Sequence, residues 1–238
     1  METTKQSYSD TFTIAWRCLL LSCRNPETFL TSILLPALMM LLFVSLFGSL
    51  IRVDGTSYTA YIVPGVLIQC AAQGSSTTAI MVNQDITSGI LSRFSTLPIR
   101  QGALLYGHVL EACARNLVTS AVVLVIALLL GFRPALTLTG LGITFLLLSG
   151  MILALSWLAV AVGILSKSAQ GASSLSSLAI VLPYLSSGFV PTEHLPPLLR
   201  TFARYQPMTP VIDAMRDALS GSPADAGTLG AALLWCAF

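Results

Sequence analysis

The feature that most constrains this chain is a series of apolar segments, each about as long as a membrane is thick. The clearest contains "LVTSAVVLVIALLLG", which lies within residues 105–131. A transmembrane helix needs about 20 mostly apolar residues to cross about 30 Å of hydrocarbon. Only 9% of the 238 residues are charged, whereas soluble domains have about a quarter. The sequence therefore predicts an all-α membrane protein that forms a single transmembrane domain, residues 1–238.

Six membrane-spanning helices are predicted from these segments. They cover about residues 29–51, 60–82, 105–131, 137–165, 171–190 and 226–238, and Pro36 predicts a kink in the first of them. The last segment has 13 residues, 226–238, which gives about 20 Å of helix and is too short to cross. We therefore expect the natural chain to continue beyond Phe238.

The distribution of Lys and Arg predicts which side of the membrane each loop occupies. With a cytoplasmic N-terminus, seven of these residues lie inside and five outside, and three of those five fall within residues 191–222. Cytoplasmic loops usually carry the excess of positive charge. We therefore predict a multi-pass protein of the cell membrane, with its N-terminus in the cytoplasm.

A helix is predicted before the first span, at about residues 9–24. Ser9 or Asp10 could cap it, and Asn25-Pro26 ends it. Its apolar face contains Phe12, Trp16, Leu19 and Leu20, which recur at helical spacing. Such a helix lies in the cytoplasmic interface of the membrane. It would serve either as a lipid anchor or as a lever that touches a cytoplasmic partner.

A polar stretch, "NQDITSGILSRFSTLPIRQG" at residues 83–102, separates the second and third predicted spans. Asn83 or Asp85 could cap a short helix here, and Leu97-Pro98 would end it. Ile86, Ile90, Leu91 and Phe94 share one apolar face, while Arg93 lies on the polar remainder. The apolar face would either rest on lipid or insert into a groove of a soluble protein.

Residues 191–222 do not have the pattern of an ordinary loop. They predict two short amphipathic helices broken at Gln206-Pro207, each too short to span a membrane. Backbone at membrane depth must be buried in protein or face water. We therefore predict a re-entrant pair on the outer side, with Arg204, Pro207, Asp213 and Arg216 as its candidate residues; the alternative is an amphipathic loop lying on lipid.

Polar residues inside the spans are candidates for the translocation pathway. Gln69, Gln73 and Thr77 lie in the second span, and Glu111 and Arg115 lie near the start of the third. Ionisable groups in spans are often functional. The alternatives are contacts between helices for the first three, and for Glu111 and Arg115 an i, i+4 ion pair that orients the helix near the cytoplasmic boundary.

Several other functions are not supported by the sequence. No metalloprotease, nucleophile-elbow or P-loop motif occurs, so an enzyme is not expected and this chain has no P-loop for ATP. The five cysteines are widely spread and predict neither a metal site nor a disulfide framework. A net charge of +2 does not favour nucleic acid as a partner. A secondary transporter or a structural membrane subunit remains an alternative.

Two motifs in this order resemble those of type-2 ABC exporter permeases of the daunorubicin-permease kind. The first is an acidic residue, then "SGIL.RF", then "LP" and a basic residue, within 83–102. The second resembles "NP.T..ID..R....G" over residues 206–221, with Gln206 where the family usually has asparagine. The resemblance covers essentially the whole chain.

The resemblance implies the transmembrane subunit of an ATP-driven exporter of amphiphilic or hydrophobic compounds, such as a drug, an antibiotic or a lipid-like molecule. The coupling helix would comprise Asp85, Ile86, Ile90, Leu91, Arg93 and Phe94. A separate ATPase would hold ATP and Mg, so no cofactor is expected on this chain. A second permease chain, identical or similar, would complete the pathway within the lipid membrane.

Overall fold

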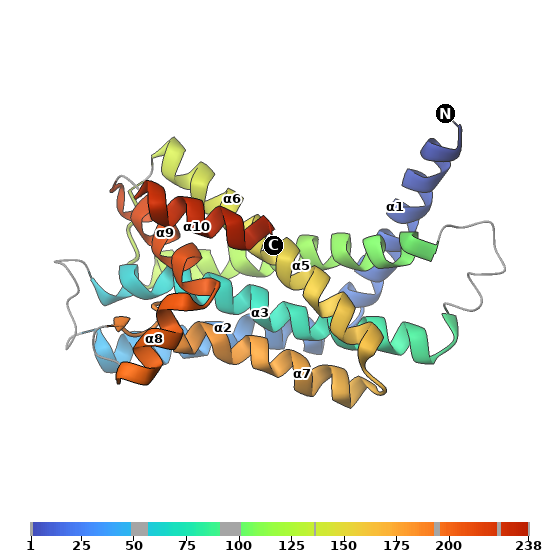
Figure 1. Ribbon diagram of the computed structural model, residues 1–238, viewed down its shortest axis with the longest axis horizontal. Helices are drawn as coiled ribbons and strands as arrows, with labels where there is room; N and C mark the ends of the chain where they lie inside the picture. Colours follow the sequence, from blue (N-terminus) through green and yellow to red (C-terminus); the bar gives the residue numbers. More distant parts are fainter. Residues whose placement is uncertain are drawn as a thin grey trace.

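The fold is a bundle of long helices, seen in a computed structural model that describes residues 2–48, 57–90, 101–135, 137–192, 196–222 and 225–237. No strand occurs in these ranges. The longest helices are α2 (Pro26–Phe47), α3 (Tyr58–Thr87), α5 (Gln101–Leu129) and α6 (Leu138–Leu165). Helices α2, α3 and α5 run broadly along the long axis of the molecule, and α6 crosses them obliquely (Figure 1). The predicted all-helical fold class is therefore confirmed.

Within the described residues, three helices are long and apolar enough to cross a membrane. These are Leu30–Phe47, Gly102–Leu129 and Leu138–Leu165, in α2, α5 and α6. Their outward faces carry large apolar side chains, for example Leu38, Leu128 and Phe145, which are 50%, 46% and 62% exposed. Water would penalise such surfaces, whereas lipid hydrocarbon is as apolar as leucine. These helices are therefore suited to a membrane.

Helix α3 lies at the centre of the bundle and packs against α2, α5, α6, α7 and α9. Its residues from Tyr58 to Ala72 are almost all buried. Because protein surrounds this helix, it carries many polar residues that a lipid-facing helix would not tolerate. It contains the predicted span 60–82 but continues to Thr87.

The predicted helix start at Asn83 or Asp85 is wrong, because both residues lie in the last turns of α3. The Asn83 amide donates instead to the carbonyl oxygens of Gly163 at 3.0 Å and Ser166 at 2.6 Å. Helix α3 ends at Thr87 with Ser88 as its C-cap, and Gly89 follows with a positive φ of 75°, a conformation that glycine adopts without strain. Of the predicted coupling residues, Leu91, Arg93 and Phe94 lie outside the described residues.

The predicted span 171–190 is wrong in its second half. Helix α7 covers only Ala169–Val181, and the short 3₁₀ helix η1 (Leu182–Leu185) follows. Residues 186–190 then form a turn, which the Tyr58 hydroxyl holds by donating to the Phe189 carbonyl at 2.9 Å. Pro183, at the start of η1, lacks the N–H that a continuing α-helix would use.

The predicted helical pair within 191–222 is present as α8 (Pro197–Tyr205) and α9 (Met208–Ser220). The break falls at Gln206 and Pro207, as the sequence predicts. The last predicted span corresponds to α10 (Ala226–Ala237). Helices α8 and α9 lie at one end of the bundle and the N-terminal half of α1 projects from the other (Figure 1).

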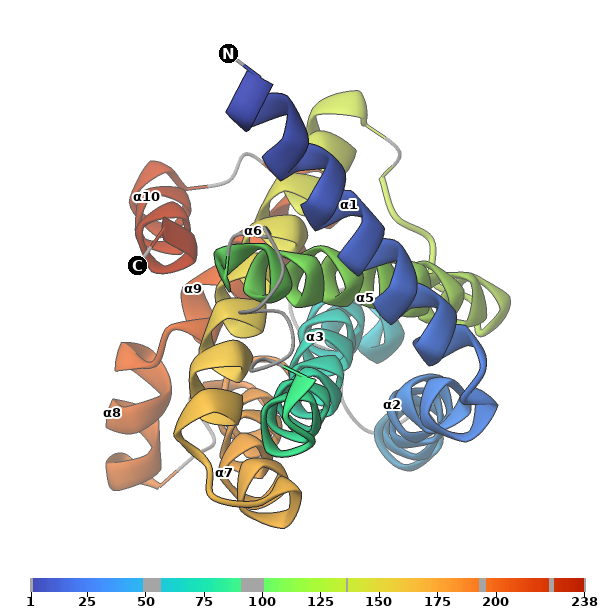
Figure 2. The same ribbon diagram turned by 90° about the vertical axis from the view of Figure 1, so that its right-hand side faces the viewer.

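Helix α1 (Glu2–Cys23) packs mainly on α5 and crosses the end of the bundle diagonally (Figure 2). It begins before residue 9, so Ser9 and Asp10 are not caps, but it ends before Asn25-Pro26 as predicted. Its buried face consists of Ile14, Ala15 and Cys18, whereas Phe12, Trp16 and Leu20 of the predicted apolar face are exposed and Leu19 is half-buried. That face remains available to lipid.

Candidate functional site

Two clusters of polar side chains lie toward opposite ends of the bundle. The α9 cluster consists of Tyr61, Ser187, Asp213 and Arg216. The α1 cluster consists of Arg17, Cys18, Ser22, Asp85, His108, Glu111 and Arg115. Each joins residues that are far apart in the sequence, so each depends on the tertiary fold.

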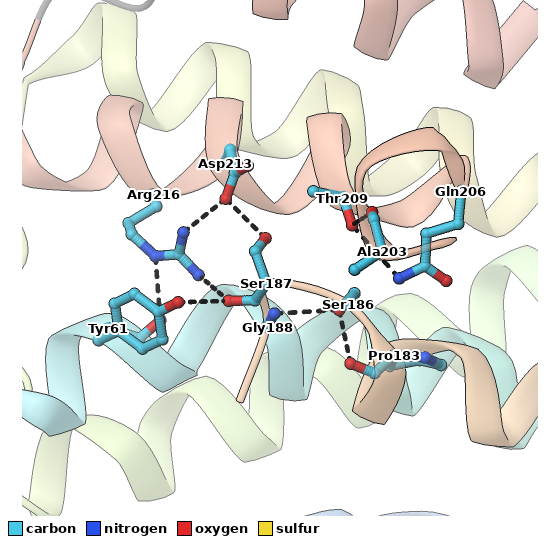
Figure 3. Close-up of polar contacts among 10 residues, drawn as sticks. All are labelled: Tyr61, Pro183, Ser186, Ser187, Gly188, Ala203, Gln206, Thr209, Asp213 and Arg216. Carbon is cyan, nitrogen blue, oxygen red and sulfur yellow. Dashed lines mark hydrogen bonds and ion pairs between the residues drawn. The ribbon is translucent and has the colours of Figure 1, made fainter. Parts of the chain in front are cut away.

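Arg216 is the centre of the α9 cluster (Figure 3). Its Nη1 donates to Asp213 Oδ1 at 2.6 Å, its Nη2 to the Ser187 carbonyl at 2.7 Å and its Nε to the Tyr61 carbonyl at 3.3 Å. The guanidinium also lies over the Tyr61 ring, 3.9 Å from the centroid. Each of the three guanidinium nitrogens thus donates a hydrogen bond. Arg216 therefore connects α9 to α3 and to the turn at 186–190.

The turn at 186–190 approaches α3 so closely that position 65 requires glycine. A Cβ added to Gly65 would lie 2.6 Å from the Gly188 carbonyl oxygen, well inside van der Waals contact. Around this contact, the Ser187 hydroxyl donates to Asp213 at 2.6 Å and the Tyr61 hydroxyl donates to the Ser187 carbonyl at 2.7 Å (Figure 3). The turn is therefore held on α3 and α9 by packing and by hydrogen bonds.

The other residues of the 206–221 motif shape the α8–α9 pair. Gln206 Nε2 donates to Thr209 Oγ1 at 3.3 Å, and that hydroxyl donates to the Ala203 carbonyl at 2.6 Å (Figure 3). Pro207 lies directly before α9. Gly221 ends α9 in the left-handed conformation, φ 76°, which favours glycine. The motif thus encodes a helix break and a helix end.

Some of the acidic and basic residues of α8 and α9 form an ion pair, and others do not. Asp213 and Arg216 form an ion pair, while Arg204 is exposed on α8 and bonds to neither Asp213 nor Asp217. Burial, together with the nearby Asp213 carboxylate, raises the pKa of Asp217.

The first half of the α1 cluster joins the end of α3 to α1 and α5. Asp85 Oδ2 accepts from Arg17 Nη1 at 3.3 Å and lies 3.2 Å from His108 Nε2. The other ring nitrogen of His108, Nδ1, lies 3.8 Å from Cys18 Sγ. His108 and Cys18 are fully buried. The predicted coupling residue Asp85 thus connects three helices.

The second half of the α1 cluster contains the predicted pair Glu111–Arg115, which is confirmed: Arg115 Nε donates to Glu111 Oε1 at 2.8 Å. Glu111 also accepts from the Ser22 hydroxyl at 2.6 Å. Arg115 Nη2 donates to Thr78 Oγ1 at 2.8 Å and to the Gly74 carbonyl at 3.2 Å. Both charged side chains are almost fully buried, so they lie within the protein between α1, α3 and α5.

A cavity of about 370 Å³ lies beside the α1 cluster. Its walls come from α1, α3, α5 and the α1–α2 connection. The polar lining residues are Cys18, Ser22, Asn25, Thr77, Gln84, Asp85, His108 and Arg115, and the apolar ones are Leu21, Ile80 and Met81. The arrangement can bind a small charged group with an apolar extension.

The remaining pathway candidates lie on α3. Thr77 lines the cavity. Gln69 is buried, and neither atom of its amide has a hydrogen-bond partner in the described part of the chain. Gln73 is half-buried, and its Oε1 also lacks a partner there. The structure does not bring Gln69 and Gln73 into the α1 cluster.

Sequence reasoning did not assign Arg17, Cys18, Tyr61 or Ser187 to a site. Their hydrogen-bond partners lie 26 to 155 residues away, and such contacts leave no pattern in the local sequence. The structure forms no candidate metal cluster of His, Cys, Asp and Glu among the residues that it describes.

Comparison with known proteins shows the family of the chain. Residues 9–220 match the family model described as ABC-2 type transporter. The daunorubicin resistance ABC transporter permease protein DrrB1 of Streptomyces coeruleorubidus is 29% identical over 215 residues, covering 90% of this chain and 76% of the relative. The probable doxorubicin resistance ABC transporter permease protein DrrC of Mycobacterium tuberculosis H37Rv is 29% identical over 233 residues, covering 90% and 78%. The chain therefore belongs to the ABC-2 type transporter family.

Proposed function

We propose that the chain is the transmembrane subunit of an ATP-driven exporter of amphiphilic or hydrophobic compounds, a class that includes drugs, antibiotics and lipid-like molecules. The observation that carries this proposal is the family match over 9–220, together with relatives named as daunorubicin and doxorubicin resistance permeases. A permease is a transport subunit and not an enzyme. ATP and Mg would bind to a separate ABC ATPase, and a second permease chain, identical or similar, would complete the pathway.

In the proposed topology α2, α3, α5, α6 and α7 with η1 cross the membrane, and α10 occupies the position of the sixth predicted span. The N-terminus and the α3–α5 connection would face the cytoplasm of the cell, and α8 and α9 would form the re-entrant pair outside. Two observations support this arrangement. Helix α1 and the α8–α9 pair lie at opposite ends of the bundle (Figure 1), and the outward face of α1 carries the exposed Phe12, Trp16 and Leu20.

The proposed coupling element is the segment from Asp85 to Phe94, which begins in the last turn of the long central helix α3. Asp85 contacts Arg17 of α1 and His108 of α5. A displacement of this segment by a bound ATPase would therefore act on three helices at once. Ile86 and Ile90 are both half-buried near this end of α3 and leave apolar surface for a protein partner.

Replacing Ile90 and Phe94 by Asp tests this coupling role. Two carboxylates on the apolar face would be costly to bury in a groove, so we expect the double variant to lose co-purification with its ATPase and to lose transport. Membrane insertion should be unchanged because the proposed segment lies outside the hydrocarbon. The matched control is Ser92→Asp with Ser95→Asp, which adds the same charge to the same segment. Normal ATPase binding and transport by the Ile90/Phe94 variant would reject the coupling role.

A further inference from the structure

We propose that the cavity beside the α1 cluster binds the phosphate group of a membrane lipid, with Arg115 as the main ligand. The cavity, about 370 Å³, lies between α1, α3 and α5. That volume is in the range of about 300–1,000 Å³ typical of ligand sites. This lipid would be a resident ligand that holds α1 against α3 and α5, and not the exported cargo.

The charges around the cavity favour an anion over a cation. Asp85 lines the cavity, but its Oδ2 already lies within 3.3 Å of both Arg17 and His108. Glu111 accepts from Ser22 and Arg115 through Oε1. Its Oε2 has no partner in the described residues, but Glu111 is not among the residues that line the cavity. A cation in the cavity would therefore have to compete with Arg17 and His108 for the Asp85 carboxylate.

Arg115 has an unused donor group. Its Nε and Nη2 are bonded, whereas Nη1 has no partner within the part of the chain that the structure describes. Arg115 is only 4% exposed and lines the cavity. A buried, unsatisfied donor on a charged group is costly, and a phosphate oxygen is the acceptor that guanidinium groups bind best. Thr77, which also lines the cavity, adds a hydroxyl donor.

The apolar part of the lining points to a lipid and not to a free phosphate ion. Leu21, Ile80 and Met81 line the same cavity. Leu21 is 45% exposed and directly follows Leu20, which is exposed as well. A lipid could therefore place its phosphate beside Arg115 while its acyl chains follow Leu21 toward the hydrocarbon. With the N-terminus in the cytoplasm, as proposed above, this lipid belongs to the inner leaflet.

Native mass spectrometry of the full chain in neutral detergent tests the proposal. The probes are phosphatidylglycerol and a diacylglycerol with the same acyl chains, which differ in the phosphate-bearing headgroup. We expect one phosphatidylglycerol to bind per chain and at least about tenfold weaker binding of diacylglycerol. Arg115→Gln should lower the affinity for phosphatidylglycerol about tenfold. Arg133→Gln, a matched change at an exposed arginine beyond the other end of α5, should leave it unchanged.

A second variant separates ligand binding from folding. Arg115→Gln alone leaves Glu111 buried without its partner, which is destabilising, whereas Glu111→Gln combined with Arg115→Gln removes both charges. The double variant, if monodisperse and helical, should also lose phosphatidylglycerol. Wild-type affinity in this variant, or equal binding of the two lipids, would overturn the proposal.

Inorganic phosphate forms the last arm of the test. The lipid would be rejected by two results together. Millimolar phosphate would displace bound phosphatidylglycerol, and phosphate alone would stabilise the protein against heat as much as the lipid does. The site would then bind a free anion. If phosphate displaces phosphatidylglycerol only weakly, the result supports a lipid as the ligand of the cavity. None of these measurements needs the ATPase or transport, so a negative result here leaves the proposed export function standing.

Discussion

At the scale of single residues, the α9 cluster depends on the shape of one guanidinium group. Arg216 reaches Asp213, Ser187 and Tyr61 at the same time, and a lysine ammonium cannot reproduce that planar fork. We expect Arg216→Lys to lower the free energy of unfolding by about 1–3 kcal/mol, the value of losing hydrogen bonds to a charged group. Thermal unfolding in detergent, followed by circular dichroism, measures the change.

Arg204→Lys is the control for this variant. Arg204 is exposed on the neighbouring helix α8, and exposed substitutions usually change stability by no more than about 0.5 kcal/mol. Equal melting temperatures for the two variants would contradict the role assigned to Arg216.

At the scale of elements, the packing of α3 on the turn at 186–190 depends on Gly65. A Cβ at this position would collide with the backbone of Gly188, and backbone gives way less easily than a side chain. We expect Gly65→Ala to destabilise the protein by about 1–3 kcal/mol, as overpacking does. Gly142→Ala in α6 is the control, because no atom lies within 4 Å of its added Cβ. It should preserve or slightly raise the melting temperature; a loss equal to that of Gly65→Ala would argue against the steric explanation.

The elements that could be predicted are those defined by local pattern. The helices at 26–47 and 138–165 follow from uninterrupted apolar length, and the α8–α9 break follows from Gln206-Pro207. The end of α3 and the turn at 186–190 were missed because both are fixed by distant partners. Asn83 bonds to residues beyond position 160, and Phe189 bonds to Tyr58. The buried face of α1 was missed for the same reason, since Ile14 and Cys18 pack with Ala103 and Leu104.

At the scale of the whole molecule, the proposed topology predicts which segments face each side of the membrane. In a cysteine-free background, Gln6→Cys and Thr96→Cys should react with an impermeant maleimide only after the cells are opened. Gly55→Cys should react in intact cells, because the α2–α3 connection would lie outside. The measurement is gel-shift labelling of whole and permeabilised cells. Labelling of position 96 from outside would reject both the orientation and the coupling role.

The packing of α1 on α3 and α5 also constrains the order in which the molecule is assembled. The ribosome completes α1 first, but its partners Asp85 and Glu111 are synthesised 68 and 89 residues after Arg17 and Ser22. During that interval the newly made helix lacks these partners on α3 and α5. The exposed face of Phe12, Trp16 and Leu20 gives it a place on the bilayer surface until the later helices arrive. In the proposed topology, that face would thus hold α1 at the membrane while the rest of the bundle is still being made.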